Sequence, residues 1–160
     1  MANLSDLSLT LRLFLKAYRW RSVNPVPRAT LKRPLEEARV ALVSSAGLVV
    51  PGDPPFDPGI KGGDFSHRII PDDTAVQRLE EHHKSDAFDH SGIEADREMG
   101  MPLAALHGLV AEGILGSSAP RHISLMGSIT APGRLVRDTA PQVVDILRRD
   151  EVDVALLVPV

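Results

Sequence analysis

The chain of 160 residues contains no cysteine, so disulfide bonds, thiolate nucleophiles and cysteine-ligated zinc are excluded within it. Long hydrophobic runs are also missing: the longest, residues 154–160, is far shorter than the ~20 residues of a membrane-spanning helix. Residues 1–20 lack the basic start, the long apolar segment and the small-residue cleavage site of a secretory signal. We therefore expect a cytoplasmic protein that does not bind membranes.

Two groups of catalytic and phosphate-binding motifs are absent as well. The sequence has neither G-x-G-x-x-G after an expected strand nor G-x-x-x-x-G-K-[ST], the loops that hold phosphates. The G-x-S-x-G elbow of serine hydrolases is missing too. Ser44 and Ser45 do follow an expected strand, where backbone N–H groups can meet an anion. The commoner explanation of two adjacent serines is that small residues fit where the chain turns tightly at the end of a strand.

The composition is that of a folded domain, with 43% hydrophobic and 24% charged residues. The net charge of −3 is unevenly distributed, because residues 1–39 carry +5 and residues 40–160 carry −8. We expect the basic segment to pack on the acidic remainder of the chain or on an acidic partner subunit. Binding of nucleic acid is not expected, because no recognition motif accompanies the basic residues. Prolines 25 and 27 break any helix. We therefore predict an N-terminal basic arm over residues 1–30 and an α/β domain over residues 31–160.

The hydrophobic pattern predicts the elements of this domain. Short apolar runs indicate buried strands, and apolar residues spaced by three and four indicate helices. We expect Thr139 to cap one helix, with Pro141 in its first turn. The expected elements are strands over 39–45, 65–70 and 152–158, an irregular Pro/Gly-rich loop over 51–64, and helices over 102–112 and after 139. This alternation predicts an α/β fold, a parallel Rossmann-like sheet with flanking helices.

Histidines and carboxylates gather in one segment, at His82, His83, Asp86, Asp89 and His90. His83, Asp86 and His90 are spaced by three and four residues, so they could share a helix face. Three interpretations stay open: a solvated polar segment, a cluster that handles substrate or protons, and a metal site.

Other polar residues carry weaker signals. His107 lies on the apolar face of the expected helix, which favours a core-edge histidine satisfied by a hydrogen bond. His122 is expected on a loop, where a functional role is more open. Asp53, Asp64 and His67 border the Pro/Gly-rich loop, and each alone is typical of a turn or a local cap.

Several blocks of the sequence form an ordered set, namely residues 44–57, 63–74, 83–90 with Asp96, 102–127 and 152–160. Together they resemble one family, the selenoprotein B family of glycine, sarcosine, betaine and D-proline reductases. The resemblance covers roughly residues 18–160, and its start is similar to the short variants of the family.

The resemblance implies a reductase that cleaves a C–N bond of an amino acid or amine with a selenocysteine. In the family this residue lies in a U-x-x-C-like segment directly after the strand that residues 152–160 resemble, so it would follow Val160. Our hypothesis is that its UGA codon was read as a stop, which makes the chain the front part of a longer selenoprotein and its sheet incomplete. The nucleotide sequence beyond codon 160 tests this hypothesis.

Loop placement and the family blocks together suggest site residues. We expect His83, Asp89 and His122 to polarise or protonate the substrate, and we expect no metal. The substrate-binding candidates are Ser44, Ser45, Asp53, Asp64 and His67. No cofactor is expected in this chain, since the family's pyruvoyl group belongs to a partner subunit.

The expected partners are that pyruvoyl-bearing subunit, a selenoprotein A or thioredoxin-like donor, and a small amine or amino-acid substrate. Two alternatives remain. One is a non-catalytic binding or assembly module that ends naturally at Val160. The other is a metal-dependent enzyme that uses the histidines.

Overall fold

The computed structural model describes residues 8–18, 22–85 and 90–160. Backbone contacts divide the chain into two units, Met1–Thr30 and Leu31–Val160. The first unit contains the helix α1 (Leu9–Ala17), which leaves the large apolar side chains of Leu9, Leu13 and Phe14 exposed. The second unit contains every strand of the described residues and holds the sites discussed below.

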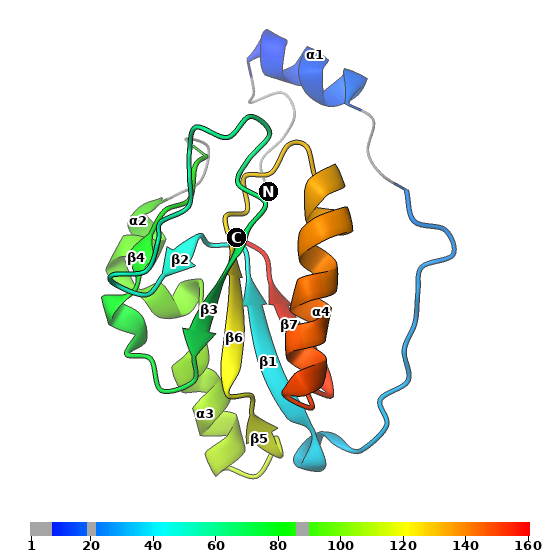
Figure 1. The fold of residues 1–160 in the computed structure, drawn as a ribbon, viewed down its shortest axis with the longest axis vertical. Coiled ribbons are helices and arrows are strands. Elements are labelled where there is room, and N and C mark those ends of the chain that lie inside the picture. The colour runs from blue at the N-terminus through cyan, green and yellow to red at the C-terminus, as the bar shows by residue number, and fades with distance from the viewer. Residues whose placement is uncertain (1–7, 19–21, 86–89) are drawn as a thin grey trace. The chain divides into compact units, whose positions relative to one another are not determined.

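The centre of the second unit is the strand β1 (Arg39–Ser44) (Figure 1). The strand β7 (Val154–Val158) pairs with it in parallel on one side. On the other side, β5 (Ser117–Ser118) pairs in parallel with the start of β1, and β6 (Arg121–Leu125) with its end. A strand buried on both faces needs a continuous apolar run, which the sequence of β1 supplies. The predicted strands at 39–45 and 152–158 and the α/β fold are thereby confirmed.

One edge of the sheet differs from the expected parallel order. The strand β3 (His67–Pro71) runs antiparallel to β6, with Ile69 opposite Ile123. A long loop rather than a helical crossover leads into β3, so the chain has no need to return in the parallel direction. A separate antiparallel pair, β2 (Leu48–Val49) and β4 (Glu80–Glu81), was not expected from the sequence. The sheet is therefore mostly parallel, with one antiparallel edge strand.

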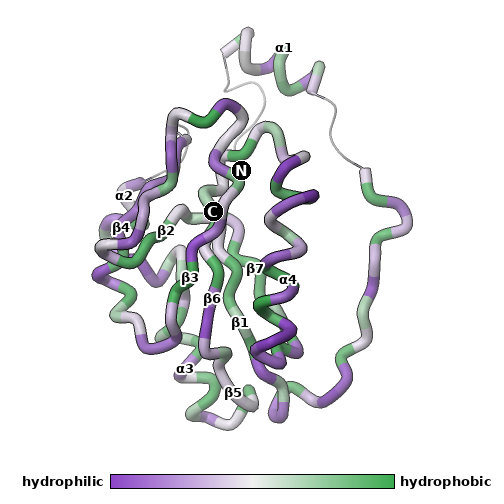
Figure 2. The backbone as a smooth tube through the Cα atoms, viewed as in Figure 1, coloured by the Kyte–Doolittle hydropathy of each residue, from purple (hydrophilic) through white to green (hydrophobic). Residues whose placement is uncertain are grey.

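Helices cover both faces of this sheet, as alternate residues of β1 show. Leu42 lies in the main hydrophobic cluster with Leu103 and Leu106 of the helix α3 (Leu103–Ala111), which confirms the expected helix at 102–112. Val43 faces the opposite side, where it lines an apolar cavity with residues of α4 (Ala140–Arg149). Figure 2 shows the hydrophobic β1 and the mixed polarity of α4. The short helical elements are η2 (Leu35–Glu37), η3 (Val76–Arg78), α2 (His90–Ala95), η4 (Arg97–Met99) and the π-helical turn η5 (Leu135–Thr139).

Two local predictions were wrong. Thr139 does not cap α4: it has helical dihedral angles, and its hydroxyl donates to the carbonyl of Phe65 instead. The reason is that the helical segment already begins at residue 133 and runs through η5 into α4. His122 lies in β6 rather than on a loop, since the flanking Pro120 and Gly127 mark only the limits of a short strand.

The strand β7 forms the other edge of the sheet, because its outer side has no strand partner among the described residues. Leu156 is 49% exposed and Leu157 is 69% exposed, on opposite faces of this edge. The amphipathic helix α4 above it has no buried residue. Within the described ranges, no helix has the length and apolar character needed to cross a membrane.

Candidate functional site

The carboxyl ends of the parallel strands meet at Ser44 and Ser45. The hydroxyl of Ser44 accepts the N–H of Ala46 at 3.1 Å, which makes Ser44 a turn former. The N–H of Ser45 donates to the carbonyl of Val158 at 3.1 Å, and its hydroxyl accepts the N–H of Val160 at 3.0 Å. Ser45 therefore joins the exit of β1 to the exit of β7. In open α/β sheets, ligands bind beyond this end of the strands.

His83 lies against two glycines at the same end. Gly127 follows β6, and a Cβ atom there would collide with the carbonyl of Ser45 and would stand 2.7 Å from the Nε2 atom of His83. A Cβ atom on Gly47 would stand 2.8 Å from the backbone nitrogen of His83. Both glycines also have positive φ angles, +80° and +68°. The imidazole thus reaches the strand ends only because these two positions have no side chain.

Local hydrogen bonds fix the orientation of the His83 ring. The N–H of Ser85 donates to Nδ1 of His83 at 3.2 Å, so in the neutral ring the proton is on Nε2, the atom beside Gly127. The carboxylate of Glu81 accepts the backbone N–H of His83. Burial lowers the pKa of His83, and the charge of His90 adds to this, although Glu81 acts in the opposite direction. The ring is therefore held in the neutral form near pH 7.

His90 completes this cluster, and its pKa is shifted in the opposite direction. Its Nδ1 atom lies 2.7 Å from Oε2 of Glu81, and its Nε2 atom lies 3.1 Å from the carbonyl of Ser85. The hydrogen bond with Glu81 raises the pKa of His90, and the hydrogen bond to Ser85 adds to this. The rings of His83 and His90 stand 6.2 Å apart, edge to face. Two histidines with pKa values moved apart are an arrangement suited to proton transfer.

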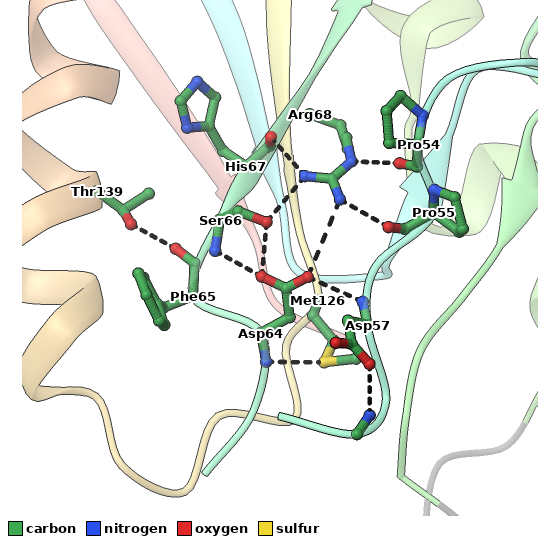
Figure 3. A network of polar contacts seen from close by, with 11 residues as sticks. Pro54, Pro55, Asp57, Asp64, Phe65, Ser66, His67, Arg68, Met126 and Thr139 are labelled. Atoms are coloured by element: carbon green, nitrogen blue, oxygen red, sulfur yellow. Dashed lines mark hydrogen bonds and ion pairs between the residues drawn. The ribbon is translucent and has the colours of Figure 1, made fainter. Parts of the chain in front are cut away.

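A second polar network surrounds the carboxylate of Asp64 (Figure 3). Its Oδ2 atom accepts the N–H of Asp57 at 2.9 Å, and its Oδ1 atom accepts the N–H and hydroxyl of Ser66 at 2.9 and 2.6 Å. Burial acts to raise the pKa of Asp64, but these hydrogen bonds and the charge of Arg68 outweigh it and lower the pKa. Asp64 is therefore an ionised group that holds the Pro/Gly-rich loop closed.

Arg68 extends this network to the start of the loop. Its guanidinium lies 3.9 Å from Oδ2 of Asp64 and 4.3 Å from the ring centre of Phe56. Its other donors go to oxygens of the loop and of the strand start, namely Pro54 O at 2.6 Å, Pro55 O at 2.8 Å, Ser66 Oγ at 2.8 Å and His67 O at 2.9 Å. The loop at 51–64 is consequently anchored at both ends.

The remaining loop candidates lie at the margin of this network. Asp53 is exposed, and its N–H closes a turn on the carbonyl of Val50 at 3.0 Å. The ring of His67 points away from the carboxylate of Asp64 (Figure 3). Burial lowers the pKa of His67, and the charge of Arg68 lowers it further. The structure thus brings Ser45 and His83 together, and it places Asp53 on the loop and His67 at the start of β3.

His122 belongs to a different cluster, inside the sheet. It is fully buried, its Nδ1 atom accepts the N–H of Leu42 at 3.0 Å, and its Nε2 atom lies 3.0 Å from Oδ1 of Asp72. The same oxygen accepts the hydroxyl of Ser118 at 2.5 Å and lies 2.8 Å from Nε2 of His107. These contacts use both ring nitrogens of His122, so its place in the fold is that of a link between strands. The hydrogen bond expected for His107 is confirmed, but its expected place at the edge of the core was wrong, because its side chain is exposed.

The metal interpretation has no support among the residues that the structure describes: no three of their His, Asp or Glu side chains could hold an ion. His83 precedes α2, which begins at His90, so the two do not share a helix face. Asp86 and the candidate Asp89 lie outside the described residues.

Sequence reasoning missed three residues that shape these sites: Glu81, Arg68 and Gly127. The signal for Arg68 was its alternation with Asp64 and Ser66 at the start of β3, which places the three side chains on one face. The contacts of Glu81 and Gly127 join distant segments, and no local spacing announces them.

The chain is similar to D-proline reductase subunit gamma of Acetoanaerobium sticklandii. The two sequences are 29% identical over 155 residues, which are 96% of this chain and 61% of the relative. The chain therefore spans less than two thirds of the length of that relative. No family model matches the chain, and no solved structure matches it. The similarity supports a relationship to a reductase family, while the selenoprotein B assignment and the interruption after Val160 stay predictions.

Proposed function

We propose that this chain is part of a reductase component that binds a small amine or amino acid and cleaves its C–N bond reductively. The similarity to a D-proline reductase subunit over 96% of the chain supports the reaction class. The observation that carries the proposal is the position of His83, whose Nε2 atom lies against Gly127 at the carboxyl ends of β1 and β6.

His83 is the group that we assign to proton handling. Reductive cleavage breaks the C–N bond and consumes an electron pair from a donor and two protons, one for the new C–H bond and one for the nitrogen of the leaving amine. A histidine at the strand ends can hydrogen-bond to that nitrogen through its Nε2 proton, and His90 and Glu81 stand behind it as a source of a further proton. Asp89 remains a candidate of the same kind, and His122 has no role in the proposal because it is fully buried within the sheet.

The attacking group in this proposal is a selenocysteine that follows Val160. The N–H of Val160 donates to the hydroxyl of Ser45, so the next residue would leave the strand at the end where His83 lies. Helix N-termini and backbone N–H groups at that end favour the selenolate over its protonated form. The electrons would come from a partner, a selenoprotein A or thioredoxin-like donor, and a pyruvoyl-bearing subunit would activate the amine. We keep the cytoplasm as the expected location.

The loop at 51–64 forms the side of the proposed substrate site. Its anchoring by Asp64 and Arg68 gives a long segment a defined path, which loops at binding sites require. We assign to Asp64 the role of positioning this loop rather than that of touching the substrate.

Two experiments test the proposal. Mass spectrometry of the protein from its native source should find a chain that continues past Val160 with selenium in it; a natural end at Val160 would favour the non-catalytic assembly module. In the reconstituted reductase complex, His83→Gln should lower kcat by roughly 100-fold, the contribution typical of a general acid. The neighbouring His82→Gln is the matched control, because His82 interacts with the exposed Glu80. Equal turnover of the two variants would refute the assignment of His83.

A further inference from the structure

A second cavity lies between the Pro/Gly-rich loop and the start of the helical segment that leads into α4. Its volume is ≈ 530 Å³, and it is open to solvent on one side. The wall from the loop consists of Ile60, Lys61, Gly63 and Phe65, and the wall from the helical segment consists of Ala131, Pro132, Gly133, Arg134 and Arg137. None of these residues belongs to the His83 cluster.

The two walls are held together by close backbone contacts. The N–H of Ala131 donates to the carbonyl of Gly62 at 3.2 Å. A Cβ atom on Gly62 would stand 2.6 Å from the Cβ atom of Ala131, and one on Gly63 would stand 2.8 Å from the Cα atom of Ile129. Both glycines also have positive φ angles, +85° and +98°. The shape of the cavity is therefore built into the fold and depends on two positions without side chains.

The charges on the cavity are all of one sign. Lys61, Arg134 and Arg137 line it, and no acidic residue does. Arg137 is already paired with Asp138, whose carboxylate lies 2.7 and 2.8 Å from two of its nitrogens. Arg134 lies over the ring of Phe65, with its guanidinium carbon 5.3 Å from the ring centre. Lys61 lines the cavity from the loop, and Arg134 lines it from the helical segment.

The helical segment adds to this positive field. It runs over residues 133–149, and the N–H of Val136 donates to the carbonyl of Pro132 at 3.0 Å as its first intrahelical bond. The N–H groups before Val136 have no acceptor within the helix, and the helix dipole makes this end positive. The end lies at the cavity, since Pro132, Gly133 and Arg134 line it.

We propose that this cavity is a binding site for a small oxyanion, either the carboxylate of an organic acid or a phosphate. A cation on each wall and a helix N-terminus match a planar or tetrahedral anion, and no carboxylate lines the cavity. The ring of Phe65 keeps the guanidinium of Arg134 in place by lying against its face. This site is independent of the proton chemistry assigned to His83.

The test is an NMR titration of the isotope-labelled 160-residue protein with two probes, inorganic phosphate and D-proline. Saturable shifts in the backbone amides of residues 60–65 and 131–137 are expected, and they should weaken as sodium chloride screens the charges. Saturation by phosphate alone would assign the site to phosphate, and saturation by D-proline would assign it to a carboxylate. The absence of saturable shifts with both probes would overturn the proposal.

Substitution then separates a built site from a general attraction to positive charge. Arg134→Gln should weaken binding of the saturating probe about 5-fold, as expected for the loss of one charge-assisted hydrogen bond at a half-open site. Arg149→Gln is the matched control, an exposed arginine at the opposite end of the same helical segment that should leave binding unchanged. Equal weakening in the two variants would overturn the proposal, because a diffuse charge effect does not distinguish the ends of the helix.

Discussion

Two clusters in this protein contain the same groups, a carboxylate and a pair of histidines, and use them in opposite ways. At Asp72 one oxygen serves His107, His122 and a serine hydroxyl, and His122 is fully buried. At Glu81 the two oxygens are divided between a backbone N–H and His90, and the neighbouring His83 directs its Nε2 atom toward a glycine. The first cluster links three segments inside the fold through one shared carboxylate oxygen. The second lies at the carboxyl ends of the parallel strands, the end at which open α/β sheets generally bind ligands.

The strongest contrast between the clusters should appear in the free energy of unfolding. His122→Ala removes a fully buried ring, leaves the N–H of Leu42 without its partner and takes away one of the three contacts of Asp72 Oδ1. We expect a loss of about 3 kcal/mol, the sum of a cavity and unsatisfied polar groups. Urea denaturation measures this loss. His83→Ala, whose ring is only half-buried, is the control and should cost clearly less; equal losses would remove the distinction between the clusters.

The close contact between Gly127 and the ring of His83 can be disrupted by a substitution at Gly127. Gly127→Ala places a methyl group 2.7 Å from the Nε2 atom of His83 at a backbone angle of +80°. We expect a destabilisation of about 1–2 kcal/mol from the strained backbone and the displaced ring. Thermal unfolding measures the first effect, and the NMR shift of the His83 ring protons measures the second. Gly108→Ala is the control, because a Cβ atom there meets nothing within 4 Å.

A third carboxylate, Asp64, can be compared with Asp72 and Glu81. It is buried, and its hydrogen bonds anchor the loop at 51–64. Asp64→Asn should cost about 1 kcal/mol, because one amide replaces a charged acceptor for several donors. The folded-state pKa of Asp64 is lowered, so its contribution is present above its ordinary value of 3.8 and is lost as the pH falls through the folded value. The variant should therefore show a flatter loss of stability in acid than the unchanged protein. Asp53→Asn, an exposed loop residue, should match the unchanged protein at every pH.

The smallest expected effect is a shift in titration rather than in stability. His83 should titrate below its ordinary value of 6.5 and His90 above it. Glu81→Gln removes the main cause of the raised pKa of His90, so the His90 titration should move down toward the ordinary value. Two-dimensional NMR of the imidazole carbons follows both rings separately. A His90 titration that stays unchanged in the variant would contradict the role of Glu81.

The same pKa shifts predict how the free energy of unfolding changes with pH. Lowered and raised pKa values have opposite effects on it. The lowered pKa values of His83 and His122 contribute stability that is present above 6.5 and is lost as the pH falls below it. The raised pKa of His90 contributes stability below 6.5 that is lost as the pH rises through its folded value. Because the buried His122 outweighs the exposed His90, acid should destabilise the protein overall.

The sequence predicted the elements whose signals are local. Residues 39–45 and 152–158 are short apolar runs, and residues 102–112 have a helical spacing of apolar positions, so hydrophobic periodicity was sufficient. Thr139 failed as a cap because the helix began earlier than its proline suggested. The predicted direction of β3 was wrong because it depends on pairing with β6, a strand far away in the sequence: His67 pairs with Leu125 and Pro71 with Arg121.

The candidate site was predictable only in part for the same reason. Ser45 could be placed at a strand end from the run before it, and His83 could be named from a cluster of polar residues. That these two meet depends on Gly127, a residue whose importance appears only when distant backbones approach each other. His122 looked equally promising in the sequence, and its complete burial within β6 distinguishes it from the half-buried His83.

The open edge at β7 has a consequence for handling the protein. Within the described ranges no strand pairs with the outer side of β7, and an edge of this kind with exposed Leu156 and Leu157 is a template onto which other extended chains can add. Concentrated solutions should therefore self-associate more readily than the net charge of −3 alone would suggest. A charged residue in place of Leu157 is the simplest change to keep the preparation dispersed.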